Sequence, residues 1–258
     1  MKVNTIDFRL FDLPIYFVCA WIGMVLAICI YIFLLYRHQF PLLPHIKALA
    51  CSMLGLILGA RLFGCLSGVY RAIGVGEIPN IKTLKNTGIV FYGGLFGLLG
   101  TYAICIKSKL IQEHRWQVLD LLAIPITLFH AIARIGCFFA GCCFGVESDL
   151  FFSVQYTTLI QGVASTSYRL PVQLFESTLN LVLFFYLLFL SEKSDWKNKN
   201  ILLRYLLIYS FGRFLLEFIR GDTVRGIIHG ISFSQIISIL IWLVILLKNI
   251  FHLKEANT

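Results

Sequence analysis

The sequence predicts an all-α, polytopic membrane protein, and three properties of its composition support this fold class. Hydrophobic residues make up 59% of the 258-residue chain, charged residues make up 14%, and the mean hydropathy is +0.84. A soluble domain has about 45–50% apolar and about 25% charged residues, so this chain has too little charge to cover a water-soluble surface. The same composition excludes a disordered chain, a secreted disulfide scaffold and a free nucleic-acid-binding domain, in spite of the net charge of +9.

Seven apolar runs are long enough to cross a bilayer, for which a helix needs about 20 residues. The first run, Pro14 to Tyr36, has 23 residues without a charge. It follows a mixed-charge segment and is too long for a signal-peptide core, so we expect a retained helix. We expect a single transmembrane domain over residues 1–258, with seven transmembrane helices at about 14–36, 48–70, 88–106, 118–136, 172–190, 201–219 and 231–247.

The boundaries and packing of these helices can also be read from the sequence. Arg37, Pro41 and Pro44 should end the first helix, because proline disrupts a helix interior. Two connections are long: residues 71–87 are polar, and residues 137–171 contain a Cys/Gly stretch followed by a Ser/Thr stretch, in which residues 151–156 fit a short strand or an interfacial segment. Small residues at a four-residue spacing favour close helix packing, and this pattern occurs at Gly55/Gly59, Gly64/Gly68 and Gly93/Gly97.

The basic residues predict an orientation in the membrane. With the amino terminus outside, the cytoplasmic stretches carry eleven Lys and Arg residues and the outer stretches carry eight. Cytoplasmic loops are enriched in these residues, so we expect the amino terminus outside and the carboxyl terminus in the cytoplasm. The bias is small because several arginines, including Arg169, Arg220 and Arg225, fall on the outer side, where they could contribute to an anion site.

Charged residues also occur within or at the ends of the apolar runs, where an arginine costs roughly 2.5–3.5 kcal/mol on insertion scales. Arg213, Glu217 and Arg220 are spaced i, i+4 and i+7, which places them on one helix face. One interpretation is an internal ion pair that fixes helix packing. The other interpretation starts from the excess of arginine over carboxylate at this depth in the membrane. A guanidinium in a dry site favours an anion, and its planar shape suits phosphate. The second interpretation predicts an outward-facing cavity for a phospholipid headgroup, near the intramembrane residues Arg61, Arg134, Glu176, Arg213 and Glu217.

The eight cysteines fall into two groups. Thiols isolated in apolar helices behave as small hydrophobes, and we expect this of Cys19, Cys29, Cys51, Cys65 and Cys105. Cys137, Cys142 and Cys143 instead cluster in a glycine-rich stretch, where they could pack, form a disulfide or redox pair, bind a soft metal or act in catalysis. A zinc site would need a fourth ligand, and neither His130 nor His229 is evidently placed to supply it.

Several segments between about residues 55 and 240 resemble, in the same order, the motifs of the prolipoprotein diacylglyceryl transferase family. The resemblance is specific as a set. The segments are residues 59–61 (family G-x-R), 87–97 (H-G-G), 134–145 (G-R-x-G-N-F-x-N-G-E-x-x-G), 168–176 (R-x-P-x-Q-L-Y-E), 209–222 (Y-x-x-x-R-F-x-x-E-x-x-R) and 234–238 (S-x-G-Q-x-x-S).

The resemblance implies a seven-helix, multi-pass enzyme of the bacterial plasma membrane. Members of this family move the diacylglyceryl group of phosphatidylglycerol to the lipobox cysteine thiol of a prolipoprotein signal peptide, and glycerol-1-phosphate leaves. The implied partners are therefore phosphatidylglycerol, prolipoproteins and membrane lipid, without nucleic acid. The resemblance implies no cofactor and no metal.

The resemblance also implies roles for individual residues. Arg134 and Arg213 match the family's essential arginines and are expected to hold the departing phosphate, whose developing charge they would stabilise. With Tyr92 they form the expected catalytic set. Glu176 and Glu217 match acidic positions that would orient the arginines. The expected substrate-binding residues are Arg61, Gly93, Gly94, Cys137, Gly145, Arg169, Gln173, Glu176, Glu217, Arg220 and Gln235.

Three positions close to this chemistry depart from the family pattern. Tyr92 stands where the family has the histidine of H-G-G, Cys137 stands in place of asparagine, and Cys142 in place of glutamate. Histidine titrates near 6.5 and a phenol near 10, so tyrosine is the poorer base. Either the base function has moved, or the chain is a divergent paralogue that acts on another thiol or lipid. A membrane thiol oxidoreductase that uses Cys137, Cys142 and Cys143, and a lipid-binding or lipid-transporting protein without chemistry, are the rival functions.

Overall fold

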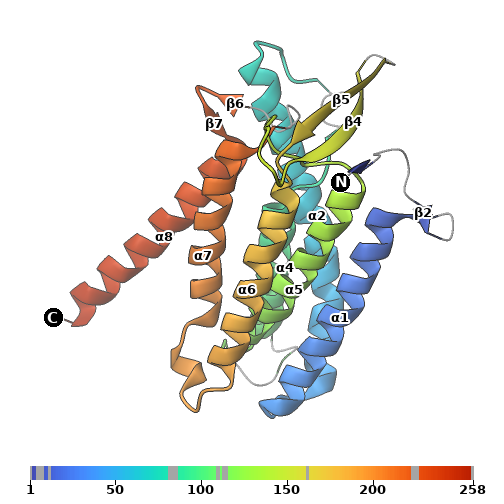
Figure 1. Cartoon of the computed structure of the whole chain (residues 1–258). Helices are drawn as coiled ribbons and strands as arrows, with labels where there is room; N and C mark the ends of the chain where they lie inside the picture. The colour runs from blue at the N-terminus through green and yellow to red at the C-terminus, as the bar shows by residue number, and fades with distance from the viewer. Residues whose placement is uncertain are drawn as a thin grey trace. The chain divides into compact units, whose positions relative to one another are not determined.

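The computed structural model describes residues 2–3, 9–10, 13–80, 87–108, 111, 116–160, 163–221 and 227–256. Within these ranges the chain is mostly helical, and seven α-helices correspond to the seven predicted runs (Figure 1). They are α1 (Ile15–Arg37), α2 (Leu42–Gly74), α4 (Phe91–Lys107), α5 (Val118–Phe139), α6 (Val172–Ser191), α7 (Ile201–Leu216) and α8 (Phe233–Ala256).

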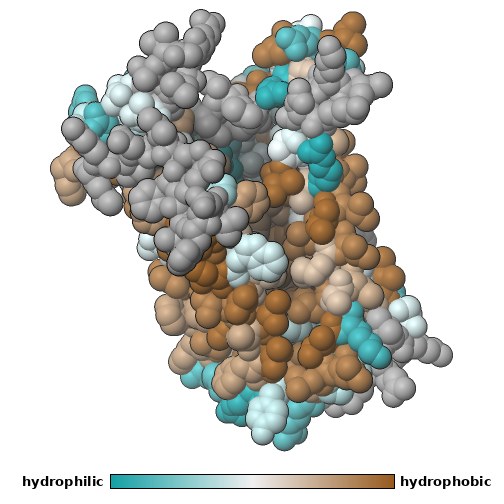
Figure 2. All heavy atoms as spheres, turned by 90° about the vertical axis from the view of Figure 1, so that its right-hand side faces the viewer, coloured by the Kyte–Doolittle hydropathy of each residue, from teal (hydrophilic) through white to brown (hydrophobic). Residues whose placement is uncertain are grey.

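Most of the helices are apolar, and several of them have the length of membrane helices. Four of them, α1, α2, α5 and α6, are long and apolar enough to cross a bilayer, and α4 and residues Phe233–Lys248 of α8 are shorter apolar helices. Large hydrophobic side chains such as Trp21 and Leu58 are exposed on the helix surfaces. On the face drawn in Figure 2, hydrophobic residues cover the sides of the helices and hydrophilic residues gather at their ends. These features are those of a helical membrane protein.

Several helix boundaries differ from the prediction: α8, for example, extends to Ala256 rather than to about residue 247, and the start of α2 and the end of α7 differ for identifiable reasons. Helix α2 begins at Leu42 and contains Pro44 in its first turn, where proline is tolerated because the first N–H groups have no partner within the helix. Helix α7 ends at Leu216 and continues as a short 3-10 helix, η2 (Glu217–Ile219). Arg220 follows in an extended conformation, with φ −76° and ψ 137°. The expectation that Arg220 shares a helix face with Arg213 and Glu217 was therefore wrong.

The connection between α5 and α6 contains a β-hairpin that is longer than the predicted strand. Strand β4 (Val154–Ile160) pairs antiparallel with β5 (Val163–Arg169), and β1 (Lys2–Val3) pairs parallel with β4, which gives the order β1-β4-β5. Two further hairpins are short: β2 (Arg9–Leu10) pairs with β3 (Leu13–Pro14), and β6 (Ile227–Ile228) pairs with β7 (Ile231–Ser232).

The chain divides into two compact units, and the first comprises Met1–Tyr31 and Leu122–Asp222. Within it α6 and α7 lie side by side (Figure 1), joined through a short 3-10 helix, η1 (Trp196–Asn198). The end of α5 and the start of β4 share a buried apolar cluster of Phe138, Val154 and Tyr156. This cluster anchors the β4–β5 hairpin to the helix that carries Arg134.

The second unit comprises Ile32–Leu121 and Thr223–Thr258, and its centre is the packing of α2 against α4. The two backbones approach closely at glycines: a methyl group on Gly59 would collide with the carbonyl oxygen of Gly93, and one on Gly97 would collide with that of Gly55. The interpretation of these glycines as helix-packing residues is confirmed. Hairpin β6–β7 precedes α8 in the same unit.

We predict that Gly97→Val destabilises the protein by about 1–3 kcal/mol, the usual cost of overpacking, because the obstacle is the backbone of α2. Gly100→Val is the matched control, since Gly100 lies on the same helix with open space around its Cα. Thermal unfolding in detergent, followed by circular dichroism, compares the two variants. Equal midpoints would show that the α2–α4 contact is not tight.

Candidate active site

A buried glutamate on α6 is the centre of the candidate site. The carboxylate of Glu176 contacts Arg134 of α5 through two atoms, with Arg134 Nε 3.0 Å from Oε2 and Arg134 Nη2 3.1 Å from Oε1. Arg213 of α7 approaches the same carboxylate, with its Nη1 3.7 Å from Oε2. The side chain of Glu176 is only 2% exposed. One carboxylate therefore joins three helices of the first unit.

A second buried carboxylate completes the ion-pair cluster. Glu217 Oε2 lies 2.7 Å from Nη2 of Arg213, and the Glu217 side chain is 1% exposed. Arg220 also interacts electrostatically with Glu176. Among the residues that the structure describes, the cluster contains three arginines and two glutamates, an excess of one positive charge. An excess of positive charge in a buried site favours an anionic ligand.

Further hydrogen bonds hold Glu176 and Arg134 in place. Tyr209 donates its hydroxyl to Glu176 Oε1 at 3.1 Å, and Arg134 Nε lies 3.2 Å from Nε2 of His130, one turn earlier on α5. Asn180 donates to the backbone oxygen of Glu176 at 2.8 Å, and Ser177 donates to the backbone oxygen of Ala131 at 2.8 Å. These hydrogen bonds fix α5, α6 and α7 around the two arginines.

The loop after α5 is attached to the segments that follow β5 and η2. The Gly145 N–H donates to Leu170 O at 2.8 Å, the Val146 N–H to Ile219 O at 2.9 Å, and the Gly221 N–H to Phe144 O at 3.0 Å. A Cβ on Gly145 would lie 2.7 Å from the Cβ of Leu170, which is too close for any other residue. The position matched to the closing glycine of the family signature is therefore a point of close backbone packing.

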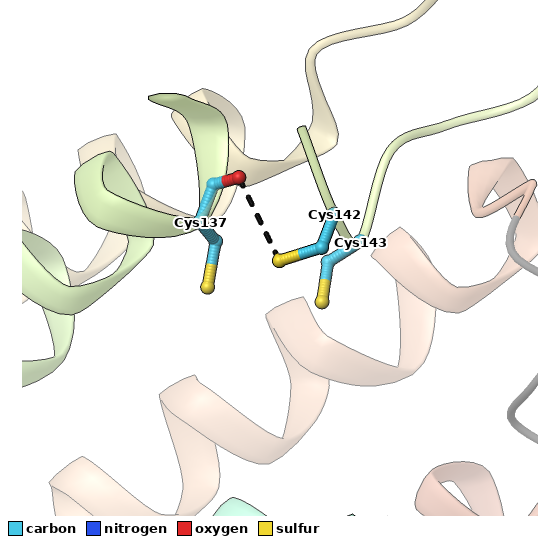
Figure 3. A group of neighbouring side chains, drawn as sticks. All are labelled: Cys137, Cys142 and Cys143. Atoms are coloured by element: carbon cyan, nitrogen blue, oxygen red, sulfur yellow. Dashed lines mark hydrogen bonds between the residues drawn. The ribbon is translucent and has the colours of Figure 1, made fainter. Parts of the chain in front are cut away.

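Cys142 and Cys143 lie in this loop, and Cys137 lies in the last turn of α5, facing them (Figure 3). Their sulfur atoms are all within 4.8 Å of one another, although Cys137 is buried and Cys142 is exposed. The Cys142 thiol points to the carbonyl oxygen of Cys137, at 3.7 Å. Cys143 has a left-handed backbone with φ 61°, which is uncommon outside glycine.

The electrostatic environment shifts the pKa values of the Cys142 and Cys143 thiols in opposite directions. Hydrogen bonds from Cys137 and Cys142 lower the pKa of the Cys143 thiol, and the positive charges of Arg134 and Arg220 lower it further. Hydrogen bonding to Cys137 and Cys143 raises the pKa of the Cys142 thiol. A negative charge in the cluster is therefore favoured on Cys143.

Gln173, at the start of α6, supports the cysteine loop. Its Nε2 donates to Cys142 O at 2.6 Å, and its Oε1 accepts a hydrogen bond from the Tyr156 hydroxyl at 3.3 Å. Burial raises the pKa of Tyr156 to about 12, so this hydroxyl remains a donor at neutral pH. The predicted role of Gln173 as a substrate-binding residue remains a prediction; its observed contacts position the loop.

Arg169, at the end of β5, has its own partners at the edge of the hairpin. Its Nη2 lies 2.6 Å from Glu147 Oε1, its Nε donates to Ser167 at 2.8 Å, and its guanidinium stacks over the Phe144 ring at 4.8 Å. Its ion pair is with Glu147 rather than with either buried glutamate. Arg225 lies outside the described residues.

Tyr92, expected to be catalytic, belongs to the second unit. It is buried on α4, and its hydroxyl lies 2.9 Å from Ser238 Oγ of α8. Ser238 donates its own hydroxyl proton to Ser234 O at 3.0 Å. Tyr92 is therefore the donor in its contact with Ser238, and its ring stacks on Phe96.

The other expected binding residues of the second unit make structural contacts. Arg61 donates to Thr87 O at 2.5 Å. Gly93 packs against α2, where a Cβ would lie 2.5 Å from Phe63 Cβ, and a Cβ on Gly94 would make ordinary contact with Ala60 at 3.5 Å. Gln235 accepts from the Ser232 N–H at 2.9 Å while its own N–H donates to Ser232 Oγ at 3.3 Å, which is a capping box at the start of α8.

Sequence reasoning assigned no role in this cluster to three residues: His130, Tyr209 and Asn180. His130 precedes Arg134 by four residues, and Asn180 follows Glu176 by four, so each lies on the same helix face as a charged residue. That spacing was the available signal. The capping box of Gln235 was also visible, as Ser-x-x-Gln before an apolar run.

Comparisons with known proteins identify similar sequences along nearly the whole chain. A family model described as "Prolipoprotein diacylglyceryl transferase" matches residues 5–250. A protein of Clostridium tetani named phosphatidylglycerol–prolipoprotein diacylglyceryl transferase is 34% identical over 239 residues, which cover 90% of this chain and 91% of the relative. A Clostridium perfringens protein of that name, numbered 2, is 38% identical over 65% of this chain and 64% of its own. A Campylobacter lari protein of the same name is 25% identical over 100% of this chain and 96% of its own.

We predict that Glu176→Gln lowers the free energy of unfolding by about 3–5 kcal/mol, because removing one partner of a buried ion pair leaves uncompensated charge. The matched control is Glu147→Gln. Glu147 also pairs with an arginine but its side chain is 68% exposed, and surface pairs contribute about 0–1 kcal/mol. Denaturant titration in detergent measures both variants, and a loss for Glu176→Gln no larger than the control's would contradict the assigned role.

Proposed function

The chain belongs to the prolipoprotein diacylglyceryl transferase family, and from this membership and the buried arginine cluster we propose that it transfers the diacylglyceryl group of phosphatidylglycerol to a prolipoprotein. The acceptor is the thiol of the lipobox cysteine. The acceptor sulfur bonds to the glyceryl carbon that carries the phosphate, the bond from that carbon to oxygen breaks, and glycerol-1-phosphate leaves with the electron pair. The thiol proton passes to a base, since the thiolate is the reactive form.

The observation that carries this proposal is the pair of guanidinium groups, Arg134 and Arg213, held by one buried carboxylate. Negative charge develops on the phosphate oxygen as the carbon–oxygen bond breaks, and fixed positive groups stabilise it most where water is excluded. A guanidinium has five N–H donors, more than one carboxylate can accept. Arg134 donates from Nη2 to Glu176 and from Nε to His130, so donors remain for a phosphate.

Arg134 and Arg213 together form the proposed phosphate clamp. The two glutamates would fix the geometry of this clamp and would not take part in bond formation. Glu176 fixes both arginines, and Glu217 fixes Arg213 from the other side. Because three arginines face two carboxylates, the cluster keeps a positive charge for the lipid. Without Glu176 and Glu217 two flexible side chains would have to be ordered at the moment of binding, at a cost in side-chain entropy.

We assign Tyr92 a role in substrate hydrogen bonding rather than that of a strong base. Its hydroxyl donates to Ser238. A phenol with a pKa near 10 is a poor proton acceptor at neutral pH. The base function of the family's histidine is then either shared with another group or carried out by the Tyr92 phenol, which is the weaker base.

The same family membership also supports a placement in the membrane. We propose that all seven helices span the plasma membrane, with the amino terminus outside and the carboxyl terminus in the cytoplasm, as a single transmembrane domain. The apolar helices α1, α2, α5 and α6 support spanning, and the distribution of basic residues supports the orientation.

The direct test is incubation of the purified protein with phosphatidylglycerol labelled in its acyl chains and a peptide that contains a lipobox cysteine. We expect the label on the peptide, in a bond that resists thioester cleavage, together with released glycerol-1-phosphate. Phospholipid binding without transfer would favour a lipid-binding protein instead. Transfer to a different thiol only would favour a divergent paralogue, and redox turnover of Cys137, Cys142 and Cys143 without transfer would favour an oxidoreductase.

We predict that Arg134→Ala or Arg213→Ala lowers transfer by at least about 100-fold, the size of effect seen when one charge-stabilising donor is removed. Arg204→Ala is the control, because Arg204 lies on the same helix as Arg213 but is exposed and donates to Lys199 O and Tyr186. Initial rates with labelled lipid measure the effect. Unchanged turnover in either clamp variant would remove the clamp from the mechanism.

We predict that Tyr92→Phe lowers the transfer rate at least about tenfold, within the range for a positioned proton-transfer or hydrogen-bonding group. Tyr102→Phe controls for the loss of a buried hydroxyl, since Tyr102 lies on the same helix and its hydroxyl lies 2.7 Å from His45. If both variants lose activity equally, or if Tyr92→Phe keeps the wild-type rate, the Tyr92 hydroxyl has no specific role.

A further inference from the structure

The cysteine cluster at the end of α5 has the properties of a metal site that the transfer reaction does not require. Cys137, Cys142 and Cys143 each offer one sulfur, and the three sulfurs are within 4.8 Å of one another (Figure 3). Zinc–sulfur bonds are about 2.3 Å long, so the sulfurs of a tetrahedral zinc thiolate lie roughly 3.8 Å apart. A small side-chain adjustment brings the cluster to that spacing. We propose that these three cysteines bind a thiophilic cation such as Zn²⁺.

The backbone holds the sulfurs together before any ion binds. Gly141 and Cys143 both have positive φ, 65° and 61°, and this reversal turns the chain so that Cys142 and Cys143 face the end of α5. A non-glycine residue in this conformation is strained, and the strain is maintained by the surrounding contacts. Gln173 anchors the turn through Cys142 O.

Charge around the cluster also fits a metal–thiolate complex. Three thiolates and one divalent cation carry a net negative charge. Arg134 and Arg220 interact electrostatically with Cys143, and Arg134 also with Cys137. Guanidinium groups would repel a bare cation but stabilise an anionic complex. On binding, the metal replaces the thiol protons, which pass to solvent, and neither the sulfurs nor the ion changes oxidation state.

Access and ligand number define the kind of site. Cys142 is exposed, Cys143 is partly buried and Cys137 is buried, so an ion can enter from the side of Cys142. Three protein ligands leave one position of a tetrahedral zinc open, as in catalytic rather than structural zinc sites. Water or an external thiol would complete the coordination. Two of the ligands, Cys137 and Cys142, occupy positions where the resembled family signature has Asn and Glu, so the site would distinguish this chain from typical members.

Metal binding can be measured without lipid or acceptor peptide, so its outcome is independent of the proposed transfer. The purified, reduced, metal-free protein in detergent is titrated with Co²⁺, which gives a thiolate-to-cobalt charge-transfer band, and then with Zn²⁺. We expect one Co²⁺ per chain, displaced by Zn²⁺. Zinc should also slow the alkylation of Cys142 and leave that of Cys29, an exposed cysteine on α1, unchanged.

Substitutions then identify the ligands. Cys137→Ser, Cys142→Ser and Cys143→Ser should each weaken zinc binding by more than the roughly 10- to 100-fold effect of losing an outer partner, while Cys29→Ser keeps the wild-type affinity. Absence of the cobalt–thiolate band in the wild-type protein would overturn the proposal. So would wild-type affinity in a cluster variant, or a disulfide among the three cysteines that persists under reducing conditions.

Discussion

The shared carboxylate of Glu176 is the interaction on which the rest of the site depends. A carboxylate buried to this degree is stable in its charged form only if it is paired and hydrogen-bonded. Arg134 and Arg213 supply the pairing from two different helices, and Tyr209 supplies a further hydrogen bond. The arginines gain equally, because neither could be held inside an apolar bundle without a counter-charge. The result is a rigid pair of guanidinium groups with an excess of positive charge, which is what a lipid phosphate requires.

The connection between α5 and α6 places a second kind of chemistry beside this pair. Gly145 allows the loop after α5 to pack directly on the chain that leads into α6, and Gln173 ties the cysteine turn to the start of that helix. Arg134 and Cys137 are one helical turn apart on α5. The same short segment therefore carries an arginine of the proposed phosphate clamp and one of three converging thiols, and the positive charge of Arg134 acts on Cys137 and Cys143.

The sequence predicted the helices well and the contacts between them less well. The apolar runs are long and continuous, so seven helices were visible, whereas Pro44 concealed the true start of α2 because proline is compatible with a first turn. The sequence predicted that Arg134, Glu176 and Arg213 belong to one site. It could not predict that one carboxylate pairs with both arginines, because this depends on how α5, α6 and α7 pack. Arg220 was misplaced because the break after Leu216 has no proline or glycine to announce it. The binding role of Gln235 stays a prediction, and its local capping pattern with Ser232 explains its observed contacts.

The most direct measurement is an experimental structure of the protein with phosphatidylglycerol bound. The account predicts that the phosphate oxygens lie at charge-assisted hydrogen-bond distance, about 2.7–2.9 Å, from guanidinium nitrogens of both Arg134 and Arg213, with Glu176 still between the two arginines. A phosphate bound elsewhere, with both guanidinium groups satisfied by protein carboxylates alone, would contradict it.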